Sequence, residues 1–307
     1  MLRGALGLGF CRAGNSGILS PSQLSLRRLP LTLDLVIRSA GWAGAACAVV
    51  ASVLTLRAFF DPEAARGERA ARVFLAGATL LMTVAIVARA AELGTVPLSS
   101  PLESLFTYGW LVFFVYLLLV RAPERPAVGT LLVPFGTLCA LAGITGLTAP
   151  ADVQPVLKNP LFAFHALAAF LGYSALSVAC CAGILYLVLH DQIAHKRMGR
   201  LAARLPSLAD LDALGHRTVI SGLTLLTASI VAGMVWAKQE WNVLWIWEPK
   251  GVWALLTWVV YVFYLVARNS AGWRGVRAAW VSAIGFVASI FTLLGTNYLL
   301  GWGRHVF

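Results

Sequence analysis

Tryptophan is concentrated in one short stretch of this chain, between positions 236 and 253. The sequence holds 11 tryptophans. Five of them lie within this stretch: Trp236, Trp241, Trp245, Trp247 and Trp253. An aromatic belt at the membrane interface places one or two tryptophans at the end of a spanning helix, so it explains this density poorly. Glu248 and Lys250 add charged groups that a belt does not need.

On a helix, Trp241, Trp245 and Glu248 would fall at positions i, i+4 and i+7 and would share one face. We expect that face to offer a flat aromatic surface to a large planar ligand, with Lys238 and Lys250 placed to meet acidic groups. A planar, apolar, anionic ligand and a structural belt explain these residues about equally well. Haem b fits the ligand description, because it is an apolar ring that carries two propionates.

Histidine is the residue type that would complete such a site, since haem iron commonly takes neutral imidazole as an axial ligand. His165 lies near the start of one apolar segment, and His305 lies just beyond the last one. An ionisable group at that depth is costly unless it faces the bundle interior or a ligand. His165 and His305 are therefore the candidates for a metal-ligating pair, although each histidine taken singly is more often an interfacial or hydrogen-bonded one. The remaining histidines, to which we assign no role, are His190, His195 and His216.

The composition requires a membrane. Of 307 residues, 59% are hydrophobic and 12% are charged, and the mean hydropathy is +0.80. Lipid cannot satisfy backbone amides, so long apolar runs must be helices. We predict an all-α fold, a polytopic membrane helix bundle of about eight transmembrane helices. The apolar segments run approximately over residues 39–60, 71–91, 104–120, 127–147, 161–189, 217–237, 251–267 and 277–300.

The positive residues predict the orientation of the bundle. The loops after the odd-numbered segments hold fourteen Lys and Arg residues, and the other loops and the C-terminus hold five. Cytoplasmic loops carry this excess, so we expect the tryptophan-rich stretch to face the periplasm or the external side of an inner or plasma membrane. The same rule explains most of the net charge of +11 without nucleic acid. The arginines of the N-terminal tail disagree with this orientation.

The chain divides into two parts on composition. Residues 1–34 are predicted to be an N-terminal extension, with a Ser, Gly and Pro content typical of disorder, and residues 35–307 to be a single transmembrane domain. The five cysteines form no CxxC or CxxCH motif and are expected to be packing residues. Glu103 is expected to cap a helix, although a carboxylate there could also orient a ligand histidine.

Several motifs resemble the WWD signature of haem-handling proteins, and within that superfamily the CcsA/ResC type, the membrane subunit of the system II cytochrome c synthase. The resemblance covers roughly residues 75–307. Its motifs are Pro97–Leu105, Leu205–Asp212, Gly233–Ala237, Trp241–Trp258, Gly272–Gly275 and Asn297–His305.

This resemblance implies an external site where haem rests on the tryptophan-rich loop between His165 and His305. Reduced haem would be presented there to an apocytochrome c, whose CxxCH thiols become thioethers on the vinyl groups. The implied partners are a CcsB/ResB-like membrane protein and a thiol-reducing protein. Two departures are present. The usual Asp of the motif is Glu248, and Val266 replaces the histidine that the family attributes to a second, intramembrane haem site.

Three functions compete on this basis. The first is a haem-binding subunit of a cytochrome c synthase, and hence of a haem lyase, which is favoured by the complete tryptophan loop and both outer histidines. The second is a non-catalytic haem chaperone or a HemX-like regulator of tetrapyrrole synthesis, which Val266 favours. The third is a secondary transporter, for which we find no paired intramembrane charges or inverted repeat.

Overall fold

The computed structural model describes residues 31–61, 65–119, 126–149, 153–196, 199 and 202–300. Within these ranges it is helical and contains no strand, and eight helices are long and apolar enough to cross a membrane. The prediction of an all-α membrane bundle is therefore confirmed. The helices are α2 (Leu31–Phe60), α3 (Ala65–Leu93), α4 (Pro101–Leu119), α5 (Pro126–Gly143), α6 (Pro160–Ala194), α7 (Leu208–Trp241), α8 (Pro249–Ser270) and α9 (Val276–Ile290).

Four short helical segments complete the described chain. They are η1 (Ile144–Thr148), η2 (Pro155–Lys158), η3 (Ala202–Arg204) and the π-helical η4 (Phe291–Leu300). The predicted boundary at residue 35 falls inside α2, which begins at Leu31. Of the predicted extension, residues 1–30 lie outside the described residues.

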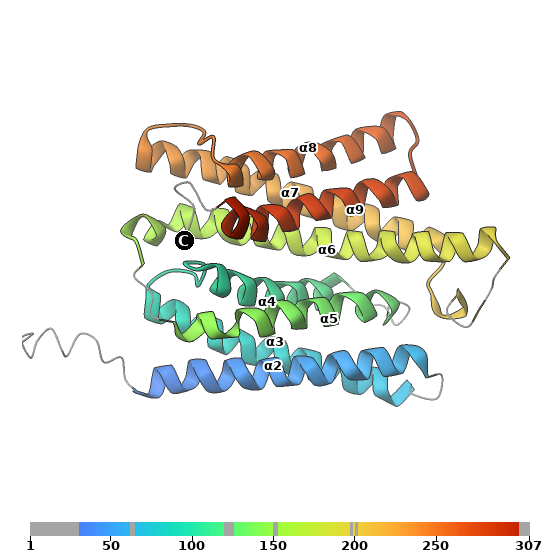
Figure 1. Cartoon of the computed structure of the whole chain (residues 1–307), viewed down its shortest axis with the longest axis horizontal. Coiled ribbons are helices and arrows are strands. Elements are labelled where there is room, and N and C mark those ends of the chain that lie inside the picture. Colours follow the sequence, from blue (N-terminus) through green and yellow to red (C-terminus); the bar gives the residue numbers. More distant parts are fainter. Residues whose placement is uncertain are drawn as a thin grey trace, which may run out of the picture.

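α6 occupies the middle of the bundle. It packs most extensively against α7 and also contacts α4, α5 and α9. Figure 1 shows α2 and α3 on one side of α6 and α8 on the other, with all these helices running along the long axis of the molecule. The start of α6 and the connection from α7 to α8 lie at the same end of the bundle (Figure 1). Sequence segments around residues 160 and 245 are thereby brought together.

Glycine allows α6 and α7 to approach closely. A Cβ atom on Gly172 would lie 3.0 Å from the main-chain oxygen of Gly222, and a Cβ on Gly222 would lie 3.0 Å from that of Gly172. Small residues at a helix contact permit this approach in membranes, where van der Waals packing replaces the hydrophobic effect between helices. The contact fixes the register of α6 against α7, and therefore the relative positions of the residues near the start of α6 and the end of α7.

The connection between α7 and α8 is a loop and not a continuous helix. Asn242 adopts a left-handed conformation (φ 57°), and its N–H donates a hydrogen bond to the main-chain oxygen of Lys238, so α7 ends here. The next helix, α8, begins at Pro249. Residues 242–248 therefore have no helical periodicity. The predicted stripe of Trp241, Trp245 and Glu248 on one helix face is wrong, because the αL residue Asn242 ends α7 directly after Trp241 and the next helix begins only at Pro249.

Glu103 has two structural roles near the start of α4. Its main-chain N–H donates to Ser100 Oγ (3.1 Å), and its carboxylate accepts from the N–H and hydroxyl of Ser99 (3.2 and 2.8 Å), which is a capping arrangement as expected. Its other carboxylate oxygen accepts from Arg89 Nε and Nη2 at 2.8 and 2.7 Å. Arg89 and Glu103 are 3% and 1% exposed, so this ion pair joins α3 to α4 inside the protein.

A second ion pair joins the start of α7 to the end of α8. Arg268 donates to both carboxylate oxygens of Asp212, at 2.9 and 2.6 Å, and the N–H of Gly275 donates to the same carboxylate at 3.1 Å. The pair is bidentate, which gives it a defined geometry as well as charge. It holds the start of α7 to the end of α8 and to the turn before α9.

Candidate functional site

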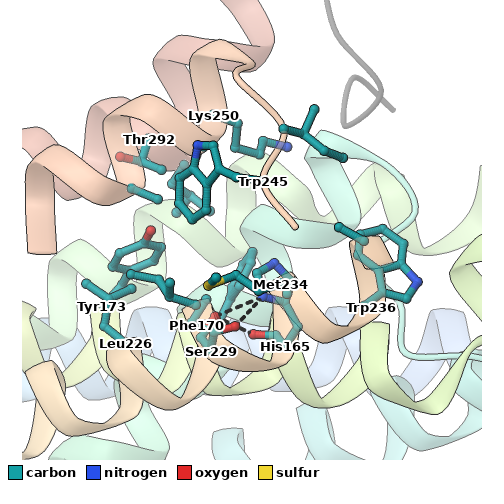
Figure 2. A pocket seen from close by; sticks show the side chains of 18 of the residues that line it. His165, Phe170, Tyr173, Leu226, Ser229, Met234, Trp236, Trp245, Lys250 and Thr292 are labelled. Carbon is teal, nitrogen blue, oxygen red and sulfur yellow. Dashed lines mark hydrogen bonds between the residues drawn. The ribbon is translucent and has the colours of Figure 1, made fainter. Parts of the chain in front are cut away.

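A cavity opens where α6, α7, α8 and η4 meet beside the loop of residues 242–248. The space between its walls is about 940 Å³, a volume that includes open solvent at the mouth. The lining is largely apolar, with Phe170, Leu226 and Met234 among its walls. Figure 2 shows polar groups reaching this space from several elements: His165 and Tyr173 from α6, Lys250 from α8 and Thr292 from η4.

Four of the predicted site residues line this cavity: His165, Trp236, Trp245 and Lys250. They come from two helices, the loop and the first turn of α8, so only the tertiary structure brings them together. In Figure 2, Trp245 and Lys250 lie on one side of the cavity and His165 on the other. A planar ligand that enters between them would meet an aromatic ring, a cation and an imidazole.

The other predicted residues of the loop do not line the cavity. Trp241 packs edge-on against Trp236, with ring centroids 4.9 Å apart. Trp247 is 72% exposed, and its ring meets that of Trp245 at 6.2 Å. Glu248 is buried at the start of α8, and Trp253 contacts Phe291, with centroids 4.3 Å apart. His305 lies outside the described residues.

Trp236 has a structural role as well as a place in the cavity wall. It is 1% exposed and belongs to a small apolar cluster with Leu98, Leu157, Phe162 and Ala166. This cluster packs the end of α7 against the start of α6 and the segments beside them. One bond reinforces that contact, because Asn159, which caps α6, donates to Glu240 on α7 at 2.8 Å. The apolar cluster and this hydrogen bond therefore fix the position of the cavity wall at Trp236.

His165 is held by α7. Its Nδ1 lies 2.7 Å from the main-chain oxygen of Ser229 and 3.1 Å from Ser229 Oγ. Its ring lies nearly parallel to that of Trp236, at 21° and a centroid distance of 6.3 Å. A histidine on the second turn of a membrane-spanning helix thus satisfies the condition that ionisable groups in a membrane face the protein interior.

Trp245 carries a polar atom suited to a ligand. Its indole Nε1 is buried, and no side chain or backbone group within the described residues accepts a hydrogen bond from it. A buried donor without an acceptor costs free energy, which a ligand acceptor would offset. Together with the cationic Lys250, this donor gives the apolar cavity a rim that favours an acidic, acceptor-bearing ligand. These groups fit the two propionates of haem, and His165 fits its iron.

The sequence-based prediction missed several lining residues, including Ser229, Gly233, Tyr173 and Thr292. A signal for two of them existed. Ser229, Gly233 and Trp236 fall at i, i+4 and i+7, which places them on one face of a helix. Because Trp236 was already a predicted site residue, this spacing could have extended the site along α7. Thr292 had no such signal, since it lies in the π-helical η4, whose periodicity differs from that of an α-helix.

Comparison with known proteins identifies the family of this chain. The sequence pattern of the family described as "Cytochrome C assembly protein" matches residues 98–302, which includes the cavity and the loop. The chain belongs to this family. The match begins just before α4 and ends after η4, so the described part of the cavity lies inside it.

The relatives of this family member include several CcsA proteins. The chain is 31% identical to the cytochrome c biogenesis protein CcsA of Synechococcus sp. (strain CC9605), over 88% of this chain and 96% of that protein. It is 33% identical to CcsA of Guillardia theta, over 74% of this chain and 82% of that protein. The resemblance to the CcsA type that its motifs predict is therefore confirmed.

A solved structure shares the fold. The cytochrome c haem lyase CcmF superposes with a TM-score of 0.63 at 18% identity, over 95% of this chain and 48% of the lyase. The chain therefore spans about half the length of that lyase. At this identity the likeness shows a common helical architecture and leaves the activity to be argued from the site.

Proposed function

We propose that this chain is the haem-binding membrane subunit of a cytochrome c synthase, with haem b as its bound substrate. One observation carries the proposal: His165 from α6 and the pair Trp245 and Lys250 from the tryptophan-rich stretch line one largely apolar cavity. Imidazole, an aromatic surface and a cation are the groups that haem iron, the porphyrin ring and the propionates require. Membership of the cytochrome c assembly family supports the same ligand.

In this proposal His165 and His305 are the axial ligands, and the haem is presented at the external, or periplasmic, face. The haem supplies two vinyl groups, and an apocytochrome c supplies the thiols of a CxxCH motif. Each thiol adds across one vinyl double bond: sulfur bonds one carbon, and hydrogen ends on the other, without net oxidation or reduction. The chain's own contribution is positioning, which holds the reacting edges together and excludes competing orientations.

The proposed partners follow from the same chemistry. Free thiols are needed on the client, so a thiol-reducing protein would act before attachment. A CcsB/ResB-like membrane protein would complete the synthase, as the relatives' type implies. A non-catalytic haem chaperone or HemX-like regulator is the second candidate, and Val266 favours it. That side chain is 55% exposed on α8, and valine cannot ligate iron where the family pattern has histidine.

The test of haem binding is spectroscopic. The wild-type protein, purified in detergent, is expected to carry haem with a low-spin, bis-imidazole absorption spectrum in the oxidised and reduced states. His165→Ala and His305→Ala should each lose or shift this spectrum. His190→Ala is the matched control, because His190 stacks on Tyr186 and does not line the cavity. A wild-type spectrum in both ligand variants would contradict the ligand assignment.

A second experiment separates the synthase from the chaperone. The chain is produced together with a CcsB/ResB-like protein and a reporter apocytochrome that carries CxxCH, in cells that lack their own attachment system. Covalent haem on the reporter, dependent on His165, is expected for the synthase. Haem binding without covalent attachment would favour the chaperone.

A further inference from the structure

His165 lies against one face of α7, although it projects from α6. Three positions of that face meet its ring: Ser229, Gly233 and Trp236. Their spacing of i, i+4 and i+7 places them along a single stripe of the helix. Figure 2 shows His165 beside Ser229, with hydrogen bonds drawn between them, and Trp236 farther along the same helix. The histidine is therefore positioned by three consecutive turns of its neighbour.

The hydrogen bonds determine which ring nitrogen carries the proton. The main-chain oxygen of Ser229, 2.7 Å from His165 Nδ1, can only accept, so Nδ1 must donate. The Ser229 hydroxyl donates in turn to the main-chain oxygen of His165 at 2.8 Å. With its hydrogen committed there, Oγ can accept from Nδ1 at 3.1 Å. The neutral ring consequently carries its lone pair on Nε2, and that lone pair can bind iron.

Gly233 supplies the space in which this ring lies. A Cβ atom at position 233 would be 2.7 Å from His165 Nδ1 and 2.8 Å from its Cε1. Both distances are below 3.0 Å, and Cβ atoms in real proteins essentially never approach another heavy atom that closely. The helix backbone and the flat ring leave little freedom, so any residue larger than glycine must push the imidazole away from α7 and from the Ser229 oxygens.

We infer that Ser229 and Gly233 are positioning residues that fix the tautomer and the orientation of His165, so that α7 determines how this ligand meets haem iron. The inference rests on the proposed haem-binding function. Groups that accept a hydrogen bond from a ligating imidazole raise its basicity and hold its plane, and their loss typically weakens metal binding by about 10–100-fold. Both residues line the cavity, and the role inferred for them is to hold the imidazole of His165 in place.

Gly233→Ala is the direct test of the space. The added methyl group is expected to move the imidazole, to weaken haem binding by about tenfold or more, and to reduce the low-spin fraction of the spectrum. Gly215→Ala is the matched control on the same helix, because its Cβ would meet the nearest atoms at an ordinary 3.9 Å. Haem binding by Gly233→Ala at the wild-type affinity and spin state would overturn the role of Gly233.

An imidazole rescue distinguishes displacement of the ring from damage to the fold. In His165→Gly, added imidazole is expected to restore the low-spin spectrum. The double variant His165→Gly/Gly233→Ala should be restored equally well, because free imidazole is not attached to the α6 backbone and can shift into the open cavity. If imidazole restores the spectrum of His165→Gly but not that of the double variant, Gly233→Ala harms the site in another way, and the inference would be wrong.

Ser229→Ala tests the hydrogen bond from the histidine. Loss of the Oγ acceptor makes His165 a weaker donor to ferric iron, so the haem midpoint potential is expected to rise. Ser221→Ala is the control, since the Ser221 hydroxyl bonds only within its own helix, to Arg217 O at 3.1 Å. An unchanged potential together with an unchanged affinity would exclude a role for Ser229.

A measurement on the haem-free protein keeps this inference separable from the proposed function. With ¹⁵N-labelled histidine, the His165 resonances should show Nδ1 protonated in the wild type and a mixed tautomer in Gly233→Ala. A wild-type Nε2–H tautomer would overturn the inference even if haem binds. If haem does not bind at all, the proposed function fails, and the tautomer result still tests the contact between His165 and α7.

Discussion

At the scale of single residues, Lys250 connects the cavity to a charged ligand. It lies at the second position of α8, and its side chain reaches the space that Trp245 and His165 also line (Figure 2). A lysine near the end of a spanning helix can donate a charge-assisted hydrogen bond to a carboxylate. Such bonds contribute about 1.5–3 kcal/mol, which corresponds to a substantial share of the affinity for a propionate.

We predict that Lys250→Gln weakens haem binding by about tenfold to a hundredfold, following from that bond energy, and that Lys250→Arg retains most of the affinity. Titration of the haem-free protein with haem measures both. Lys238→Gln should bind normally, because Lys238 is exposed and reaches only Asn242 O, at 3.4 Å. Wild-type affinity in Lys250→Gln would exclude this residue from the site.

Glu103 shows how one residue can satisfy a local and a tertiary requirement together. Its sequence context, Ser100 followed three residues later by a glutamate, already predicts a capping arrangement. The buried bond to Arg89 could not be predicted in the same way, because Arg89 is fourteen residues away and belongs to another helix. The two charges are retained inside the protein because each satisfies the other.

At the scale of elements, the contact between α6 and α7 is what places His165 beside Ser229. The close approach at Gly172 and Gly222 occurs about two turns farther into the bundle, so it controls the spacing of the two helices near the site. The Asn159–Glu240 bond holds the start of α6 to the end of α7. Because these two contacts fix α6 against α7 on both sides of His165, the histidine keeps its position relative to α7.

We predict that Gly172→Ala separates α6 from α7 and lowers the free energy of unfolding by about 1–3 kcal/mol, the usual cost of overpacking. The measurement is thermal unfolding in detergent, combined with haem titration, which should also weaken. Gly77→Ala on α3 is the control, since nothing lies within 4 Å of its added Cβ. Equal stability of both variants would mean that the helices tolerate a wider spacing.

At the scale of the whole molecule, the eight helices of spanning length in the described chain place every second connection at the same end of the bundle. The connection from α7 to α8 lies at the end where α6 begins (Figure 1), and α6 and α8 end at the other end of the bundle. Because basic sequence follows both of these helices, the positive-inside rule predicts that this second end faces the cytoplasm. The cavity would then face the external side.

We predict the sidedness through cysteine labelling. Val243→Cys, in the exposed loop beside the cavity, should react with a membrane-impermeant maleimide in intact cells. Arg274→Cys, in the exposed turn between α8 and α9, should react only after the membrane is permeabilised. The reverse pattern would place the cavity on the cytoplasmic side and would contradict external presentation of haem.

Residue composition and order were enough to predict the helical class, the approximate spans and the residue types of the site. Apolar runs of spanning length permit only helices in lipid, and loop charge follows the membrane rather than the packing. His165, Trp236, Trp245 and Lys250 could be selected because their residue types are unusual in such a context. These inferences depend on local composition, which a single chain displays directly.

Only the tertiary structure decided which of those residues meet. Trp241 and Trp253 turned toward other aromatic rings, and the loop broke the expected stripe, because an αL residue and a proline end the helices around it. The contact of His165 with Ser229 and Gly233 depends on helix spacing and rotation across 64 residues of sequence. Such contacts arise from side chains packed between helices, and no periodicity within one helix encodes its partner's register.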